Sequence, residues 1–196
     1  MADYSAAIAR FIEWLDAAKA DPAVLEPTAM TLATVDAEGK PGARTVLLKQ
    51  VDEQGFVFYT NSRSRKGQHL AANARAALTF FWASLGRQVL IEGSVAPVTD
   101  SEADAYFASR PRISQIGAWA SQQSEPLESR EVFESRLADI EHRYEGADVP
   151  RPPHWTGYRV TPEMIEFWEA RDGRLHHRER YFRGAEGHWQ WTLLNP

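Results

Sequence analysis

The 196-residue chain contains no cysteine, and its stretches of apolar residues are short. Without cysteine it cannot form disulfides, cysteine-ligated zinc centres or iron–sulfur clusters, or use a thiol nucleophile. It lacks the run of ~18–20 apolar residues that a membrane-spanning helix requires. Asp3 and Glu13 interrupt the first segment, where a signal peptide would be apolar. We therefore expect a cytoplasmic protein with no membrane association.

Positive charge is also scarce overall, but it is unevenly distributed. The formal net charge is −5 at pH 7, which argues against a nucleic-acid-binding protein. Seven basic residues lie between positions 44 and 87, and five arginines lie between 171 and 183, each group opposed by only two acidic residues. An acidic chain that concentrates its cations in this way is suited to bind small anions there. Ordinary scatter of surface charge is the alternative.

Common catalytic motifs are missing as well. The sequence has no GxGxxG following a predicted strand, and no GxxxxGK[ST], HExxH or GxSxG. His176 and His177 are adjacent, and neighbours on a strand point to opposite faces, so they cannot chelate one metal ion together. The sequence therefore predicts no metal site.

Hydrophobic periodicity predicts an α+β fold. We expect helices over 4–20, within 62–74 after an N-cap at Ser64, from Thr99 to Ser109, from Pro111 to about Ala120, and over 127–145. Strands are expected over 30–36, 43–51, 56–61, 74–82, 87–98, 156–160, 163–170, 174–182 and 188–194, the first three as an antiparallel meander. Short antiparallel strands with late return strands predict one domain over residues 1–196, built as a closed or split β-barrel.

Two segments carry the residue types that bind phosphate. Ser64–Lys66 lies where a strand gives way to a helix, and backbone N–H groups there, with an Arg and a Lys, suit a phosphate. A merely solvated helix start is the alternative. Tyr106, Arg110 and Ser114 follow i, i+4, i+8 spacing, so a helix–turn–helix would gather them into a second cup, with Arg112 nearby.

Arg44 and Lys49 form a further pair of cations, on the predicted strand 43–51. Five residues apart, they face opposite sides of that strand unless a bulge intervenes. They would then serve two ligands or two faces of one ligand, or simply meet solvent at the strand ends.

Longer blocks of the sequence resemble the pyridoxamine 5′-phosphate oxidase family. These blocks are RTVLLK (44–49), YTNSRSRKG (59–67), RQV (87–89), SRPRISQIGAWASQQS (109–124), EFW (166–168) and RLHHR (174–178). The resemblance implies an FMN-binding split β-barrel that works as a homodimer with FMN at the interface. It also implies an oxidase that converts pyridoxamine or pyridoxine 5′-phosphate to pyridoxal 5′-phosphate with O2, releasing H2O2.

The resemblance further implies roles for individual residues. FMN would be bound by Arg44, Thr45, Val46, Leu47, Leu48, Lys49, Tyr59, Thr60, Arg65, Lys66, Gln88, Gln123, Ser124, Trp168 and Arg178. The substrate would be bound by Lys49, Tyr106, Arg110, Ser114, Arg174 and His176. Arg174 and His176 are two apart on a predicted strand and so share a face, from which they would cover the substrate ring as the catalytic pair.

The chain departs from the family pattern in three places. His177 stands where the pattern RLHDR has Asp, which removes a carboxylate that could balance Arg174 or Arg178. The final residues 193–196 lack the arginine of the usual Arg-Leu-x-Pro. The chain also begins close to its first helix, so a segment that in relatives can fold over the substrate is expected to be missing.

Two other functions remain open at this point. One is an FMN-dependent oxidase of the same fold acting on another ring system, such as a phenazine precursor. The other is a non-catalytic flavin- or haem-binding barrel. Tyr106, Arg110 and Ser114 favour a phosphorylated substrate over the first alternative, and the Arg174/His176 pair counts against the second.

Overall fold

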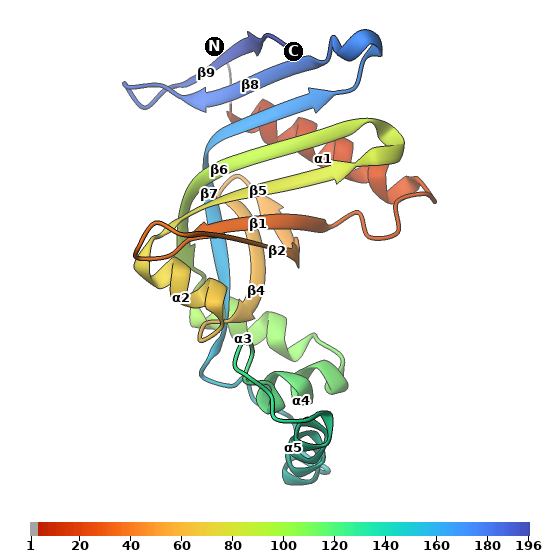
Figure 1. Cartoon of the computed structure of the whole chain (residues 1–196), viewed down its shortest axis with the longest axis vertical. Helices are drawn as coiled ribbons and strands as arrows, with labels where there is room; N and C mark the ends of the chain where they lie inside the picture. The colour runs from red at the N-terminus through yellow and green to blue at the C-terminus, as the bar shows by residue number, and fades with distance from the viewer. Residues whose placement is uncertain (1–3) are drawn as a thin grey trace.

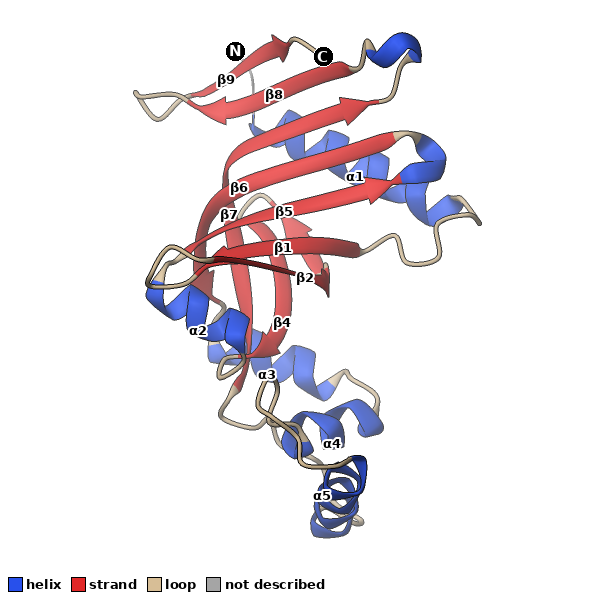
Figure 2. Ribbon diagram, viewed as in Figure 1, coloured by secondary structure: helices blue, strands red, loops and turns tan. Residues whose placement is uncertain are grey.

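A curled antiparallel sheet flanked by helices forms most of the computed structural model, which describes residues 4–196 (Figure 1). The strands are β1 (Ala29–Val35), β2 (Pro41–Leu47), β3 (Gln50–Asp52), β4 (Gly55–Asn61), β5 (Arg75–Trp82), β6 (Arg87–Pro97), β7 (Trp155–Glu169), β8 (His177–Arg183) and β9 (Trp189–Leu194). The α-helices are α1 (Tyr4–Ala20), α2 (Arg65–Ala72), α3 (Asp100–Ala108), α4 (Arg112–Ala120) and α5 (Arg130–Arg143), with short 3-10 helices η1 (Ala83–Leu85) and η2 (Asp172–Arg174). The predicted α+β split barrel is confirmed (Figure 2).

The sheet curls until the two ends of its strand order meet. That order is β2-β1-β5-β6-β7-β4-β3, with β8 and β9 added beyond β7. Only Leu48 and Lys49 separate β2 from β3 in the chain. The Leu48 N–H donates to the Thr28 carbonyl (2.9 Å) beside β1, and the Lys49 N–H donates to the Val57 carbonyl (2.8 Å) on β4. The predicted strand 43–51 is therefore divided, and the expected meander is two hairpins, β1–β2 and β3–β4.

The fifteen-residue strand β7 carries the fold from the barrel to the C-terminal hairpin. We predicted two strands here, over 156–160 and 163–170, and the structure shows one. Residues 155–160 pair with β4, and residues 164–169 pair with β8. Pro162, which cannot donate a ladder hydrogen bond, faces Gly93 at a register shift against β6, where that loss is tolerated.

Local capping signals set the helix boundaries largely as expected. The Ser64 side chain accepts the Gly67 N–H at the start of α2, and Thr99 and Glu102 form a capping box at the start of α3. The last helix starts at Arg130, after an N-cap at Ser129, rather than at residue 127. No helix in the part of the chain that the structure describes is long and apolar enough to cross a membrane.

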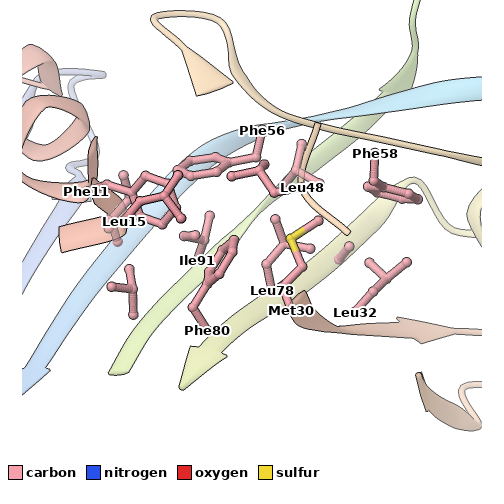
Figure 3. Packing of buried hydrophobic residues seen from close by; sticks show 14 of the residues in the cluster. Phe11, Leu15, Met30, Leu32, Leu48, Phe56, Phe58, Leu78, Phe80 and Ile91 are labelled. Atoms are coloured by element: carbon pink, nitrogen blue, oxygen red, sulfur yellow. The ribbon is translucent and has the colours of Figure 1, made fainter. Parts of the chain in front are cut away.

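The main core lies between α1 and the concave face of the sheet (Figure 3). Phe11 of α1 is fully buried, and its ring meets Phe56 and Phe80 at centroid distances of 4.8 and 5.0 Å. Leu15 follows one turn later on the same face of the helix. Strands β4 and β5 thus depend on α1 to cover their apolar side chains.

We predict that Phe11→Ala will lower the free energy of unfolding by about 3–5 kcal/mol, because it leaves a cavity among three aromatic rings. Ile12→Ala is the matched control, since the neighbouring Ile12 is 38% exposed and should lose far less. Urea denaturation of both variants measures the difference. Equal losses would show that α1 does not carry this core.

Candidate functional site

A buried lysine lies at the centre of the first half of the candidate site. Lys66 is only 9% exposed, and its Nζ donates to Thr60 Oγ1 (3.0 Å), Ser64 Oγ (3.1 Å) and Gln123 Oε1 (2.7 Å). All three partners are neutral. Burial, with a further contribution from the positive charge of Arg44, lowers the pKa of Lys66 to about 8. A bound anion would stabilise the protonated form of this lysine.

Two arginines extend this positive charge. Burial, followed by repulsion from Arg65, lowers the pKa of Arg44. The Arg65 backbone N–H donates to Ser124 Oγ (3.2 Å), which ties the start of α2 to the loop after α4. Across residues 4–196, no ion pair contains Arg44, Arg65 or Lys66. The cluster therefore carries positive charge with no carboxylate partner among residues 4–196.

Two adjoining cavities open beside this cluster. The first, of about 260 Å³, is lined by Thr45, Val46, Leu47, Lys49, Tyr59, Thr60, Lys66, Tyr106, Arg110, Gln123 and Trp155. The second, of about 370 Å³, is lined by Tyr59, Thr60, Asn61, Arg110, Ser114, Gly117, Ala118, Ser121, Gln123 and Trp155. Arg110 belongs to both, between Tyr106 and Ser114. The turn between α3 and α4 thus brings together the three residues that the spacing singled out.

Stacked aromatic rings support the wall of these cavities. The rings of Tyr59, Tyr106 and Trp155 have nearly parallel planes, and the Tyr59 centroid lies 4.0 Å from that of Tyr106 and 5.2 Å from that of Trp155, with the latter two 6.1 Å apart. Gly157 faces Tyr59 across the β4–β7 ladder, and a Cβ there would lie 2.6 Å from the Tyr59 ring. Our sequence reasoning missed Trp155. The available signal was an aromatic residue opening a strand directly after the proline-rich connector.

Arg110 is held against this stack with part of its hydrogen-bonding capacity unused. Its guanidinium carbon lies 4.8 Å from the centroid of Trp155, and its Nη1 is buried with no hydrogen-bond partner. Burial lowers the pKa of Arg110. A buried N–H without an acceptor is costly, so this group is suited to an anionic ligand that enters the cavity.

The remaining candidate residues lie at the opposite end of the molecule. Gln88 faces Trp168 across the β6–β7 ladder, and Trp168 faces Arg178 across the β7–β8 ladder. The rings of Trp168 and His176 are 4.5 Å apart. In Figure 1 this end of β7 and β8 lies far from α3 and α4, so one chain does not bring the two sets together.

The expectation that Arg174 and His176 share a strand face is wrong. Arg174 ends the 3-10 helix η2, and β8 begins only at His177. His176 precedes that strand, and its Nδ1 accepts the Arg171 N–H at 3.3 Å. Arg174 (φ 61°) and Ser124 (φ 77°) are the non-glycine residues of the described range with positive φ. Strained backbone of this kind is often found at functional sites.

The structure supplies a carboxylate for Arg178 that the sequence comparison did not identify. Glu166, only 7% exposed, accepts the Arg178 Nε–H at 2.7 Å, and the Asn195 carbonyl accepts from Nη1 at 3.1 Å. His177 instead donates to Glu179 (2.7 Å). The aspartate missing from the family pattern therefore does not leave Arg178 unbalanced.

Glu179 joins α1 to the C-terminal hairpin. Burial alone would raise its pKa, but hydrogen bonds from Arg10, His177 and Trp191 outweigh burial and lower the pKa to about 2. His177 thus belongs to a structural junction rather than to the candidate site.

Arg112 does not join the site, contrary to our expectation. Its guanidinium donates to the carbonyls of Ala147 (2.8 Å) and Tyr144 (2.6 Å) beyond α5. It borders a larger, shallower hollow of about 910 Å³ that is also lined by Glu141, Glu145 and Asp148. Because carboxylates repel phosphate, this hollow is a poorer candidate for an anionic ligand than the two smaller cavities.

A curled split barrel of this kind also occurs in solved structures. The crystal structure of a pyridoxamine 5′-phosphate oxidase-related, FMN-binding protein from Nostoc punctiforme shares the fold, with a TM-score of 0.74 and 17% identity over 100% of this chain and 99% of that one. The family model of pyridoxamine 5′-phosphate oxidase matches residues 17–144, and that of the pyridoxine 5′-phosphate oxidase C-terminal dimerisation region matches residues 155–196. The chain belongs to the pyridoxamine 5′-phosphate oxidase family.

Relatives of high identity span nearly the whole chain. A pyridoxine/pyridoxamine 5′-phosphate oxidase from Alkalilimnicola ehrlichii is 59% identical over 191 residues, covering 97% of each chain. Another of that name, from Azorhizobium caulinodans, is 56% identical over 95% of this chain and 88% of its own. The structure of PhzG from Burkholderia lata, solved with tetrahydrophenazine-1-carboxylic acid, has a TM-score of 0.90 and 35% identity over 96% of this chain and 92% of that one.

Proposed function

We propose that this protein is an FMN-dependent oxidase that converts pyridoxamine or pyridoxine 5′-phosphate to pyridoxal 5′-phosphate. Relatives named for these substrates, at up to 59% identity, support the proposal. The observation that carries it is the pairing of two separate cationic groups on one aromatic-walled cavity: Lys66 with its neighbours, and Arg110 with its unused N–H. Such a cavity suits two phosphorylated ring compounds lying together.

The residues of the first half fit an FMN phosphate. A phosphate dianion beside Arg44, Arg65 and Lys66 would offset up to two of three positive charges that have no carboxylate partner among residues 4–196. Among the described strands β2 pairs with β1 alone, so its other edge offers backbone groups from Arg44 to Leu47 to the rest of the flavin, and Leu48 follows directly after them. Tyr59, Thr60, Gln123 and Ser124 complete this half of the proposed FMN site.

The substrate phosphate is assigned to the second cationic group. Lys49, Tyr106 and Arg110 line the first cavity, and Ser114 lines the second beside Arg110. Contact with Trp155 fixes the guanidinium of Arg110 before any ligand arrives. The protein thereby holds the substrate by its phosphate, which takes no part in the oxidation, and so limits where the substrate ring lies relative to the flavin.

When bound, FMN would supply the redox chemistry by accepting a hydride from the substrate carbon and passing the electrons to O2. Pyridoxine phosphate and O2 would yield the aldehyde and H2O2, and the amine substrate would in addition consume water and release ammonia. Because the Arg171 N–H occupies Nδ1 of His176, the neutral His176 ring carries its proton on Nε2. His176 can therefore donate a hydrogen bond to the substrate from Nε2, and Trp168 packs against the ring.

The proposed site needs a second copy of the chain. Trp168, Arg174, His176 and Arg178 all lie in residues 155–196, the part matched by the dimerisation-region model. In Figure 1, β8 and the end of β7 beside it lie far from α3 and α4, and Arg110 lies in the turn between those two helices. Gln88 pairs with Trp168 at that same end of β7. We therefore propose a homodimer in which each site combines the residues around Lys66 and Arg110 of one chain with Trp168, Arg174, His176 and Arg178 of its partner.

The purified protein should show flavin absorbance and form pyridoxal 5′-phosphate and H2O2 when pyridoxamine 5′-phosphate and oxygen are added. Absorbance of the product and a peroxidase-coupled assay measure the two products. An FMN-loaded protein that forms neither would overturn the proposal. Oxidation of a reduced phenazine carboxylate instead of the phosphorylated substrate would point to the phenazine alternative.

Arg110→Ala should raise KM for the phosphorylated substrate roughly 10- to 150-fold, because it removes a charged hydrogen bond of about 1.5–3 kcal/mol. FMN content should not change, since the flavin phosphate is assigned to a different group of cations. Arg112→Ala is the matched control, because that neighbouring arginine points to the carbonyls of Tyr144 and Ala147. Loss of flavin from Arg110→Ala would show that the two phosphate groups are wrongly assigned.

Mixing two variants of low activity tests whether each site is shared between two chains. Arg110→Ala and Arg178→Ala each damage both sites of their own homodimer, but a mixed dimer has one intact site. After subunit exchange, activity at low substrate concentration should reach about a quarter of the wild-type value, because half of the dimers carry one good site of two. Arg110→Ala mixed with Lys49→Ala is the control and should recover nothing. Recovery in both mixtures, or in neither, contradicts the proposed dimer.

A further inference from the structure

Buried groups hold one edge of the Arg44 guanidinium. Arg44 Nη1 donates to the Leu32 carbonyl (3.1 Å) and to Thr34 Oγ1 (2.6 Å), both on the neighbouring strand β1. Thr34 is 1% exposed, and its hydroxyl lies 3.1 Å from Nδ1 of His69, which is 5% exposed. Three side chains from β2, β1 and α2 therefore form one buried hydrogen-bonded chain.

The donor and the acceptor of each hydrogen bond follow from which groups can donate a proton. An arginine has only donors, so Thr34 Oγ1 accepts from Arg44. Among residues 4–196, Nδ1 of His69 is the one further hydrogen-bonding partner given for the Thr34 hydroxyl, and we assign the Thr34 proton to that nitrogen. Nδ1 can accept only if it carries no proton, which makes His69 neutral with its proton on Nε2. A neutral ring also adds no fourth positive charge beside Arg44, Arg65 and Lys66.

The backbone at Gly42 leaves room for these side chains. Gly42 faces Thr34 across the β1–β2 ladder, and a Cβ at position 42 would lie 3.0 Å from Arg44 Nη2 and 3.3 Å from Cε1 of His69. Arg65 and His69 are four residues apart on α2, so they lie on one face of that helix. The same point at Gly42 lies 3.6 Å from Arg65 Nη2, which shows that both arginines and His69 converge there.

The hydrogen bonds His69–Thr34–Arg44 hold Arg44 in place against repulsion from the neighbouring cations. Burial, together with repulsion from neighbouring cations, lowers the pKa of both Arg44 and Lys66, so their charged forms are destabilised. A long arginine side chain under such repulsion would turn towards water unless it were held. The bonds to Leu32 and Thr34 hold Nη1 and leave Nη2 directed at the Gly42 gap beside Arg65.

We propose that Thr34 and His69 are positioning residues for the flavin phosphate. Through the hydrogen bonds His69–Thr34–Arg44, they keep the Arg44 guanidinium aimed at the phosphate, with His69 as the terminal neutral acceptor. This inference rests on the proposed FMN binding, and it adds two residues that touch neither the flavin nor the substrate.

The test compares FMN with riboflavin, which lacks the phosphate, on the flavin-free protein. Titration with quenching of flavin fluorescence gives both dissociation constants. His69→Leu and Thr34→Val should each weaken FMN binding about tenfold, because a misdirected Arg44 loses a charged hydrogen bond to phosphate. Riboflavin affinity should not change. A role in general stability would weaken both flavins alike.

Conservative variants keep the proposal testable if His69→Leu or Thr34→Val folds poorly. His69→Asn keeps an acceptor at the Nδ1 position and Thr34→Ser keeps the hydroxyl, so both should bind FMN within about twofold of wild type. Thr79→Val, the same substitution on β5, is the matched control and should leave both affinities unchanged. Nitrogen-15 NMR of the wild-type flavin-free protein should show His69 protonated on Nε2 and not on Nδ1.

Equal loss of FMN and riboflavin affinity, or no loss of either, overturns the positioning role. A proton on Nδ1 of His69 does the same, independently of any variant. If the wild-type protein binds neither flavin, the proposed function itself fails. The two failures are therefore told apart by the wild-type titration, which comes first.

Discussion

Two backbone hydrogen bonds at Leu48 and Lys49 hold the two ends of the curled sheet together, and the site depends on that junction. The segment leaves β2, which pairs with β1, and enters β3, which pairs with β4. It therefore places the free edge of β2, and Lys49 itself, beside Tyr59 and Thr60 of β4. If the barrel were open here, Lys49 and the edge of β2 would be separated from Tyr59 and Thr60 of β4, and the first cavity would not exist.

Uncompensated positive charge is the second constraint, and it connects the fold to the proposed chemistry. Carboxylates pair with many arginines elsewhere in the structure, among them Arg159 with Asp52 and Arg178 with Glu166. The cluster around Lys66 has only neutral partners, and one N–H of Arg110 has none. Folding therefore places charge in the cavity walls that a phosphorylated ligand can neutralise, and binding regains part of the cost of burial.

The departures from the family pattern have a structural account. Glu166 balances Arg178 from within the sheet, and His177 joins Arg10 and Trp191 around Glu179, at the contact between α1 and the C-terminal hairpin. The altered C-terminus still reaches the same arginine, since the Asn195 carbonyl accepts from Arg178. These differences change which groups hold Arg178 and leave Arg178 itself in place.

Local patterns in the sequence determined the element types, the helix caps at Ser64 and Thr99, and the two groups of residues proposed to bind phosphate, because these depend on neighbours within a few positions. Family blocks supplied the proposed residue roles. Tertiary structure alone decided the division of strand 43–51, the single strand β7 through Pro162, and the loop position of Arg174 and His176. Each of these depends on pairing partners distant in sequence. The same holds for Trp155, Glu166 and the His69–Thr34–Arg44 chain, whose members meet only when β1, β2 and α2 pack together.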